Sequence, residues 1–490
     1  MPKTVFLIAV LLTLSINRPA CADDDSSLAA LELSDCRIHA APGYPGIKAR
    51  CGILERYIDP DDPASTVLKL NVAVVPALSL EPEADPLVPI AGGPGGASTS
   101  FYAGYAHAFE KVRRHRDIVL IDQRGTGKSE VMNCDFEDDV LEGQWSREET
   151  IAYTESCLEM LPHDPRFFTT SVAVRDLEAL RVALGYPALN LYGVSYGSRV
   201  AQHYARRYPA TTRSVILDGV VPPQMALGPE VAIEAEKALQ AVFARCAESS
   251  DCNDEFPDIA KTFARLEAGL GEQAVSVELA HPISGERETV EFSDMEFAGA
   301  IRMMNYSPET VALLPLLINE AANGNFTPLA ATFLSVSESM TEQLAIGMHN
   351  AVICTEDVPF FEAFDMAALQ KTYIGPKMAE ALDASCSVWP VGVMDDGLRT
   401  PLSTDAPVLL LSGSADPITP PHFAELAAVD MGNARHLIGE NQGHGQAGRG
   451  CVPDIIGRFV ESASVDDLET DCMLRLHAMP FFLDFAGPAP

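Results

Sequence analysis

The sequence predicts an α/β protein with a mostly parallel central sheet and helices on both of its faces. Short apolar runs rich in Val, Ile and Leu end at turn residues, which is typical of buried parallel strands. Amphipathic segments lie between these runs, and such alternation favours a sheet covered on both sides. Strands are expected at residues 67–75, 87–91, 117–122, 189–194, 214–218, 407–412 and 435–438.

The expected helices form two groups. In the first, one helix covers residues 172–184 and ends at Gly185-Tyr186-Pro187, and another follows Ser195 and ends near Pro209. The second group lies in residues 222–400, where strand patterns are few, with helices at 231–246, 259–270, 309–322 and 329–348. Because the strand pattern resumes at residue 407, we interpret residues 23–221 and 401–490 as one split core. Residues 222–400 are then a mainly helical cap over the carboxyl edge of the strands.

The composition is that of a globular protein with a large acidic excess. Of 490 residues, 47% are hydrophobic and 21% are charged, which excludes wholesale disorder. Asp and Glu number 69 against 34 Lys and Arg, for a formal charge of −35. The densest basic run, residues 111–116, is short, so we expect neither a nucleic-acid partner nor binding to anionic lipid.

Residues 1–22 have the pattern of a secretory signal peptide. Lys3 precedes an apolar run at residues 5–14, and Ala20-Cys21-Ala22 fits a small-residue cleavage site. That run is too short to span a bilayer, and no later stretch has about 18 uninterrupted apolar residues. We predict an exported protein, periplasmic or secreted, without a membrane anchor. Lipidation of Cys21 is an alternative, which Arg18 disfavours because an apolar residue normally stands three positions before the cysteine.

Cysteine usage agrees with export. Without Cys21, ten of the 11 cysteines remain, and an oxidising compartment favours disulfides among them, with a connectivity that the sequence leaves open. Buried free thiols are the alternative. Zinc is less favoured because no C-x-x-C or Cys/His cluster of ligand spacing occurs, and we expect neither a metal nor a cofactor. Pairing nearest neighbours joins Cys36 to Cys51, Cys134 to Cys157, Cys246 to Cys252, Cys354 to Cys386 and Cys451 to Cys472.

The strongest chemical motif is G-x-S-x-G, formed by residues 193–197 between an expected strand and an expected helix. Small residues around Ser195 avoid clashes in the sharp, strained turn that such a serine requires. The turn lifts the Ser195 hydroxyl above the sheet and places the Tyr196 backbone N–H at a helix start. We predict Ser195 as a nucleophile and Tyr196 N–H as an oxyanion donor. The alternative is a serine in an ordinary strand–helix turn.

A nucleophilic serine needs a base, and the base needs an orienting acid. In this type of fold the expected chain order is Ser, Asp, His. Asp416 comes just after the strand at 407–412, and His444 lies in a glycine-flanked loop after the last expected strand. We predict both as members of a triad with Ser195. Asp218 also ends a strand and is the other candidate acid, although it precedes the cap.

Residues 91–97 (AGGPGGA) follow an early strand and are dense in glycine, which allows backbone N–H groups to approach a substrate. Because Pro94 has no N–H, Gly92 or Gly93 would supply the second oxyanion donor, and we prefer Gly93. A flexible turn is the alternative. Residues 122–129 (DQRGTGKS) end like a phosphate-binding loop, but Asp122 stands where that motif requires glycine, so nucleotide hydrolysis is disfavoured.

Together, AGGPGG at 91–96, DQRGTGKS at 122–129, GVSYGS at 193–198, LSGSADPITP at 411–420 and NQGHG at 441–445 resemble a known family. They are similar to the α/β-hydrolase serine aminopeptidases of the prolyl iminopeptidase and secreted tripeptidyl aminopeptidase type. The resemblance implies an α/β-hydrolase fold, action on short peptides, and Ser195, Asp416 and His444 as the triad. Ala91 departs from it, because prolyl iminopeptidases commonly carry His there, which puts a strict proline preference in doubt.

The same resemblance places carboxylates in the cap to bind the free amine of the substrate. Glu356 is the candidate here, since a disulfide at Cys354 would hold it rigidly; a solvated acidic loop is the alternative. The predicted partner is thus a peptide or small-molecule substrate, with the oligomeric state open. Two other functions stay open: an esterase of small esters with the same triad, and a catalytically silent binding protein on this scaffold.

Overall fold

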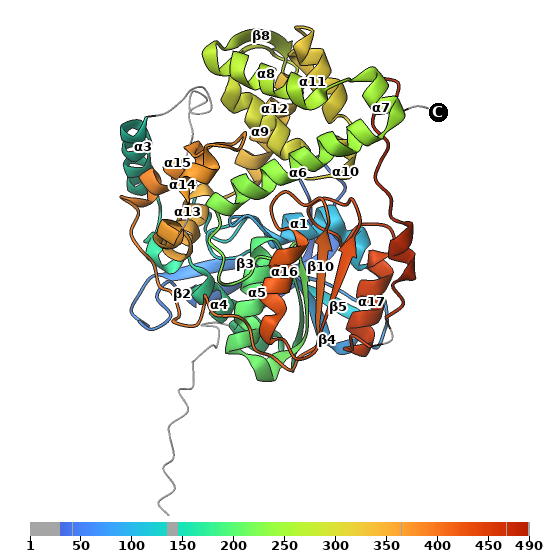
Figure 1. Ribbon diagram of the computed structural model, residues 1–490. Helices are drawn as coiled ribbons and strands as arrows, with labels where there is room; N and C mark the ends of the chain where they lie inside the picture. The colour runs from blue at the N-terminus through green and yellow to red at the C-terminus, as the bar shows by residue number, and fades with distance from the viewer. Residues whose placement is uncertain (1–29, 42, 135–145, 364, 467, 489–490) are drawn as a thin grey trace, which may run out of the picture.

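The computed structural model describes residues 30–41, 43–134, 146–363, 365–466 and 468–488. The predicted signal peptide, residues 1–22, lies outside them. A large sheet flanked by helices occupies the lower half of the molecule, and the inserted helices lie above it (Figure 1). The predicted α/β-hydrolase fold, with its mostly parallel sheet and inserted helical layer, is confirmed.

The described residues form a nine-stranded sheet in the order β1-β2-β3-β5-β4-β6-β7-β10-β11. Strands β5, β4, β6, β7, β10 and β11 run parallel, whereas β1, β2 and β3 form an antiparallel edge. The sequence did not predict β1 and β2, because exposed charged residues interrupt their apolar positions. The bounds are β1 Ser34–Ile38, β2 Ile47–Tyr57, β3 Val67–Val75, β4 Glu83–Ile90, β5 Arg116–Ile121, β6 Leu189–Val194, β7 Thr212–Asp218, β10 Val408–Gly413 and β11 Ala434–Gly439.

Successive strand residues enter two hydrophobic cores, one on each face of the sheet. In β10, Val408 and Leu410 pack on one face, while Leu409 and Leu411 pack on the other. The first face is covered by α4 (Thr170–Leu184), α5 (Tyr196–Arg207) and α16 (Pro421–Ala427). The second is covered by α1 (Ser98–Tyr105), α2 (Glu110–Arg113) and α17 (Val452–Ser462). Helix α3 (Arg147–Met160) lies outside these layers and packs against the insertion.

Between β7 and β10 the chain builds the inserted layer, which has its own core around Phe243, Phe263 and Phe297. A hairpin of β8 (Val275–Ala280) and β9 (Arg287–Phe292) was not predicted there, because only alternate residues of these short strands are buried. The helices are α6 Pro229–Glu248, α7 Ser250–Glu255, α8 Ile259–Glu272, α9 Asp294–Met304, α10 Pro308–Val311, α11 Leu314–Ala322, α12 Thr327–Gln343, α13 Ile346–Glu356, α14 Met366–Leu369 and α15 Lys377–Cys386. Short 3₁₀ helices are η1 Ala106–Phe109, η3 Pro165–Phe167, η4 Pro209–Thr211, η5 Val358–Ala363, η6 Ala428–Asp430 and η7 Asp471–Arg475.

Two helices predicted as continuous are each broken in the structure. Residues 309–322 divide into α10 and α11, and residues 329–348 divide between α12 and α13. At the second break, the Ala345 backbone N–H donates to the Gly95 carbonyl at 3.1 Å. A backbone bond to a distant loop has replaced the helical bond, which local periodicity does not reveal.

Each disulfide lies within the core or within the inserted layer, and the C-terminal segment joins the two. In the described residues the bonds are Cys36–Cys51, Cys134–Cys157, Cys246–Cys252, Cys354–Cys386 and Cys451–Cys472, which pairs nearest neighbours in sequence. After η7 the chain rises from the core to the insertion. There Phe481 joins the core of the inserted layer, and the Phe482 N–H donates to the Ala312 carbonyl at 2.9 Å. Among the described helices none has the length and apolar character to cross a membrane.

Candidate active site

Ser195 occupies a strained turn between β6 and α5. Its φ of 54° and ψ of −128° lie where non-glycine residues are rare. A Cβ on Gly193 would lie 2.2 Å from the Gly197 carbonyl oxygen, and one on Gly197 would lie 2.4 Å from the Ile90 carbonyl oxygen. The close approach of strand and helix therefore requires glycine on both sides of Ser195, as the motif predicts.

Backbone hydrogen bonds hold this turn at the carboxyl edge of the sheet. Ser195 N–H donates to the Asp218 carbonyl at 2.9 Å, which ties the turn to the end of β7. The Ser195 carbonyl accepts from the Ser198 backbone N–H at 2.8 Å and from its hydroxyl at 2.6 Å. The position of the serine is thus set by two neighbouring strands and by the first turn of α5.

His444 and Asp416 form a hydrogen-bonded pair at the same edge. His444 Nδ1 lies 2.8 Å from Asp416 Oδ2. The other carboxylate oxygen, Oδ1, accepts from the backbone N–H groups of Ile418 at 2.8 Å and Thr419 at 2.9 Å. Thr419 Oγ1 lies 2.8 Å from Asp416 Oδ2 and 3.1 Å from His444 Nδ1. The carboxylate is therefore fixed on one side by its own turn and faces the imidazole on the other.

The pair shifts each partner toward its charged form. Burial opposes charge on both groups, but the attraction and hydrogen bond between them prevail. The pKa of Asp416 is lowered, helped by the Ile418 and Thr419 N–H groups, and the pKa of His444 is raised. Asp416 is thus a carboxylate that can stabilise an imidazolium.

The inserted layer also positions His444. Its backbone N–H donates to the Tyr306 carbonyl at 2.8 Å, and the Tyr306 ring meets the imidazole edge-on with centroids 5.5 Å apart. A Cβ on Gly443 would lie 2.2 Å from that same carbonyl oxygen, so the close approach needs a glycine. Sequence reasoning missed Tyr306, since nothing in the local pattern points to a residue 138 positions away.

The histidine loop lies beside the serine turn. A Cβ on Gly219, one residue after the partner of Ser195 N–H, would lie 3.0 Å from His444 Cε1. A Cβ on Gly445 would lie 4.0 Å from Val194 Cγ2. Within the described residues no hydrogen bond joins Ser195 Oγ to His444 Nε2. The serine is therefore not hydrogen-bonded to the Asp416–His444 pair in this structure. Catalytic hydrogen bonds of substrate-free enzymes are often long and tighten when substrate binds.

Asp218, the other candidate acid, has different partners. Its carboxylate accepts from the Tyr192 hydroxyl at 2.7 Å and from the backbone N–H groups of Gln446 and Ala447 at 2.8 Å. Complete burial raises its pKa despite these donors. Asp218 therefore fastens the loop that carries His444 and makes no hydrogen bond to the imidazole among the described contacts.

The glycine loop lies against the serine turn, as an oxyanion hole requires. A Cβ on Gly92 would lie 2.9 Å from Ser195 Cβ, and Gly93 is exposed with a φ of 113°. Tyr196 begins α5, so its N–H has no acceptor within the helix. Gly92 thus lies against Ser195 and Tyr196 directly follows it, and the preference for Gly93 over Gly92 stays a prediction.

Glu356 does not lie at an open site that a substrate amine could enter. It ends α13 and is 0% exposed, as is Asp357, so the solvated-loop alternative is wrong. Its Oε1 accepts from Thr170 N–H and its Oε2 from the Thr170 hydroxyl, both at 2.8 Å. Because the Glu356 side chain has no exposed surface, a substrate amine could reach it only if the surrounding contacts rearranged.

The comparisons with known proteins agree with this geometry. The family model described as TAP-like protein matches residues 371–472, which include Asp416 and His444. Serine protease Hip1 of Mycobacterium tuberculosis is 32% identical over 225 residues, covering 42% of this chain and 42% of Hip1, less than half the length of that relative. The tripeptidyl aminopeptidase of Streptomyces lividans is 23% identical over 430 residues, 79% of this chain and 76% of that one. The predicted resemblance to the α/β-hydrolase serine aminopeptidases is confirmed.

Among solved structures, the proline iminopeptidase of Mycobacterium smegmatis matches 84% of this chain and 98% of its own, with 14% identity and a TM-score of 0.37. The prediction of an enzyme of the serine hydrolase class agrees with the names of the curated relatives. Within the described residues, no group of three or more His, Cys, Asp or Glu side chains could hold a metal ion.

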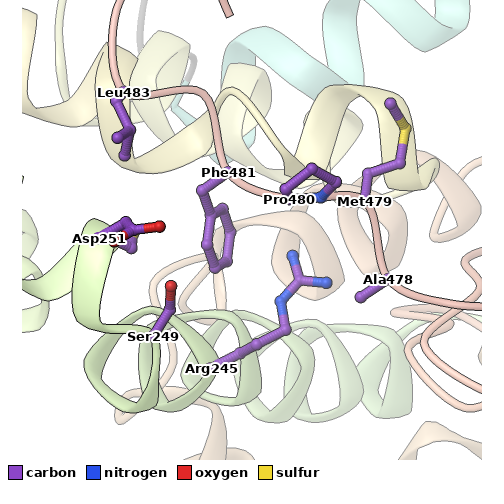
Figure 2. A pocket seen from close by; sticks show the side chains of 9 residues that line it. Arg245, Ser249, Asp251, Ala478, Met479, Pro480, Phe481 and Leu483 are labelled. Atoms are coloured by element: carbon purple, nitrogen blue, oxygen red, sulfur yellow. The ribbon is translucent and has the colours of Figure 1, made fainter. Parts of the chain in front are cut away.

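A separate cavity of about 210 Å³ lies between α6, α7 and the C-terminal segment (Figure 2). The Arg245 guanidinium stacks over the Phe481 ring at 4.2 Å and forms one wall. Ser195, Asp416 and His444 do not line it. This cavity is therefore part of the junction between the inserted layer and the C-terminal segment, apart from the candidate active site.

Proposed function

We propose that this chain is an exported serine hydrolase, an aminopeptidase that releases N-terminal residues or short peptides. The observation that carries the proposal is the strained Ser195 turn beside a hydrogen-bonded Asp416–His444 pair. The names of the relatives support a peptidase, and the disulfides are typical of an oxidising compartment. Ser195, Asp416 and His444 are the proposed triad, and residues 222–400 are the proposed cap over it.

The proposed reaction is a two-step acyl transfer. His444 Nε2 takes the Ser195 proton as Ser195 Oγ attacks the scissile carbonyl carbon, and Asp416 holds the imidazole in the required tautomer. The N–H groups of Tyr196 and Gly93 donate hydrogen bonds to the oxyanion, each contributing about 3 kcal/mol. His444 then protonates the leaving amine, and water releases the acyl group by the same steps.

Recognition of the free amine needs a carboxylate with a free acceptor position. Glu230, in the first turn of α6, offers one: its Oε2 is buried and accepts no hydrogen bond within the described residues. Burial raises its pKa to about 7, with Asp357 adding to this and Arg399 opposing it. A substrate ammonium group would restore the charge of this carboxylate. Glu230 is therefore a second candidate for the amine-binding role, beside Glu356.

The test combines a Ser195→Ala variant with a panel of free and N-acylated aminoacyl and tripeptidyl amides. The wild type should cleave the free substrates and react with a fluorophosphonate at Ser195. Ser195→Ala should fold normally and lose at least about 1,000-fold in kcat. Glu230→Gln should raise KM for free substrates and leave blocked ones unchanged. Equal turnover of blocked amides and simple esters would indicate an esterase, and an unlabelled, inactive wild type would indicate a binding protein.

A further inference from the structure

Helix α13 contacts both sides of the proposed oxyanion hole. It belongs to the inserted layer, packs against the core and lies next to α15 (Figure 1). Its 11 residues span about 16 Å. One end meets the glycine loop that carries Gly93, and the other end connects to α5, which begins at Tyr196.

At its N-terminal end, α13 holds the glycine loop by hydrogen bonds and by close contact. Ala345 N–H donates to the Gly95 carbonyl at 3.1 Å, and Leu344 forms a β-bridge with Gly96. A Cβ on Gly95 would lie 2.9 Å from the Ala345 carbonyl oxygen, so no side chain fits between them. The loop that supplies one donor is thus packed directly on this helix.

One side chain of α13 extends this contact to the residue after Gly93. His349 Nδ1 lies 3.1 Å from the Pro94 carbonyl oxygen. Because that oxygen only accepts, the ring must carry its proton on Nδ1. Burial lowers the pKa of His349, although the hydrogen bond to Pro94 opposes this, and the lowered pKa favours the neutral ring.

At its C-terminal end, α13 connects to Tyr196 through a directed chain of hydrogen bonds. The Thr170 hydroxyl donates to the Glu356 carboxylate at 2.8 Å and accepts from the Tyr196 hydroxyl at 2.7 Å. The Gln123 side-chain N–H donates to the same Tyr196 oxygen at 3.1 Å. Each hydroxyl proton in this chain has one available acceptor, so the orientation of the Tyr196 side chain is fixed.

A second connection links the same end of α13 to the next turn of α5. Arg199 donates to both oxygens of Asp357, at 2.8 and 3.0 Å. Glu356 lies 3.7 Å from that guanidinium, and all three side chains are almost fully buried. Paired charges at such a site cost several kcal/mol to separate, so this end of α13 and helix α5 move together.

We infer that α13 positions both backbone donors of the oxyanion hole, with His349 acting on the Gly93 side and Glu356 on the Tyr196 side. The inference rests on the proposed serine hydrolase function. In this role both residues act through the loop and the turn that they hold, without requiring contact with substrate.

The test measures kcat, KM and the inhibition constant of a peptide aldehyde, whose adduct with serine mimics the oxyanion. His349→Ala should lower kcat about 10- to 100-fold, less than the loss of a whole donor, with KM within twofold. Aldehyde binding should weaken by the same factor as kcat. His349→Asn should restore most of both, because its amide N–H can donate to the Pro94 carbonyl. Glu356→Gln, which keeps an acceptor for Thr170 N–H, should show a smaller effect of the same kind.

Asn350→Ala is the matched control, since Asn350 is the next residue on α13 and its side chain makes no hydrogen bond among the described contacts. If His349→Ala behaves like Asn350→Ala while the wild type is active and labels at Ser195, the positioning role is wrong and the proposed function stands. The proposal would also be refuted if kcat fell only in proportion to the folded fraction of His349→Ala, while the ratio of the aldehyde inhibition constant to KM stayed unchanged. That outcome would indicate a loss of folded protein and no loss of oxyanion binding. A wild type that neither turns over substrate nor labels at Ser195 would overturn both proposals.

Discussion

The turns after β7 and β10 are alike in position, but their aspartates have different partners. Leu411 of β10 pairs in register with Asp218 of β7, and each strand has an acidic residue at or just after its end, near His444. Asp416 presents one carboxylate oxygen to the imidazole, because its own turn occupies the other. Both oxygens of Asp218 bind backbone N–H groups of the histidine loop instead. The two aspartates thus differ in what they hold: Asp416 holds the imidazole of His444, and Asp218 holds the backbone of the loop that carries it.

Asp416→Asn should produce the largest difference between the two turns. The amide cannot stabilise the imidazolium and favours the wrong tautomer of His444, so kcat should fall about 10,000-fold. Unfolding should change little by comparison, because the remaining carbonyl oxygen of the substituted side chain can still accept from the Ile418 and Thr419 N–H groups. Steady-state kinetics and thermal unfolding of the same preparation check both. A loss of less than tenfold would mean that another acid serves His444.

The pH dependence of kcat/KM should also distinguish Asp416 from Asp218. The charge of Asp416 is the main influence that raises the pKa of His444, and Asp218 contributes less. Since His444 must be neutral to accept a proton, kcat/KM should rise with pH through an inflexion above 6.5. Removing the charge of Asp416 should move this inflexion to lower pH, and removing that of Asp218 should move it less. Identical shifts in the two variants would contradict the assignment.

Asp218→Asn should have an intermediate effect, mainly on stability. An amide N–H would face the Gln446 and Ala447 N–H groups, which leaves a buried donor without an acceptor at about 1–3 kcal/mol. The histidine loop should loosen, and kcat/KM should fall roughly 10- to 100-fold. Denaturant unfolding and kinetics measure the two effects. If kcat falls as far as in Asp416→Asn without loss of stability, Asp218 is the catalytic acid.

The smallest expected effect concerns a third buried carboxyl, that of Glu356. Burial raises its pKa from 4.5 to about 7, and Arg199 only partly opposes this. Between these values the folded state binds more protons than the unfolded state, so stability falls as pH rises from about 4.5 to 7. Glu356→Gln should remove part of this slope, on the order of 1–3 kcal/mol, and other carboxyls with raised pKa values, such as Glu230 and Asp218, should retain their share. Unfolding at pH 5 and pH 8 checks it; equal slopes in both proteins would contradict it.

The sequence predicted those features that depend on local chemistry. The apolar runs of the parallel strands are continuous because both faces are buried, and the glycines at 193 and 197 reflect contacts within one turn. Residues 416 and 444 could be chosen because strand ends at one sheet edge must meet. Thr419 could also have been found, since a hydroxyl three residues after an aspartate commonly closes such a turn.

The sequence did not predict the features that depend on contacts between distant residues. The break before α13 arises from a bond between Ala345 and Gly95, 250 positions apart, and residues 329–348 otherwise continue a helical pattern. From the sequence, Glu356 could belong to a solvated acidic loop. In the structure, Thr170 and Arg199 pack against it. The charge of a residue identifies it as a candidate, but its partners decide what it does.

The C-terminal segment adds an attachment between the inserted layer and the core. The chain joins the two at both ends of the insertion, and the segment through Phe481 and Phe482 joins them again. If the inserted layer covers Ser195 as proposed, three attachments restrict its rotation about any single hinge. We then expect a substrate to enter without displacement of the whole layer.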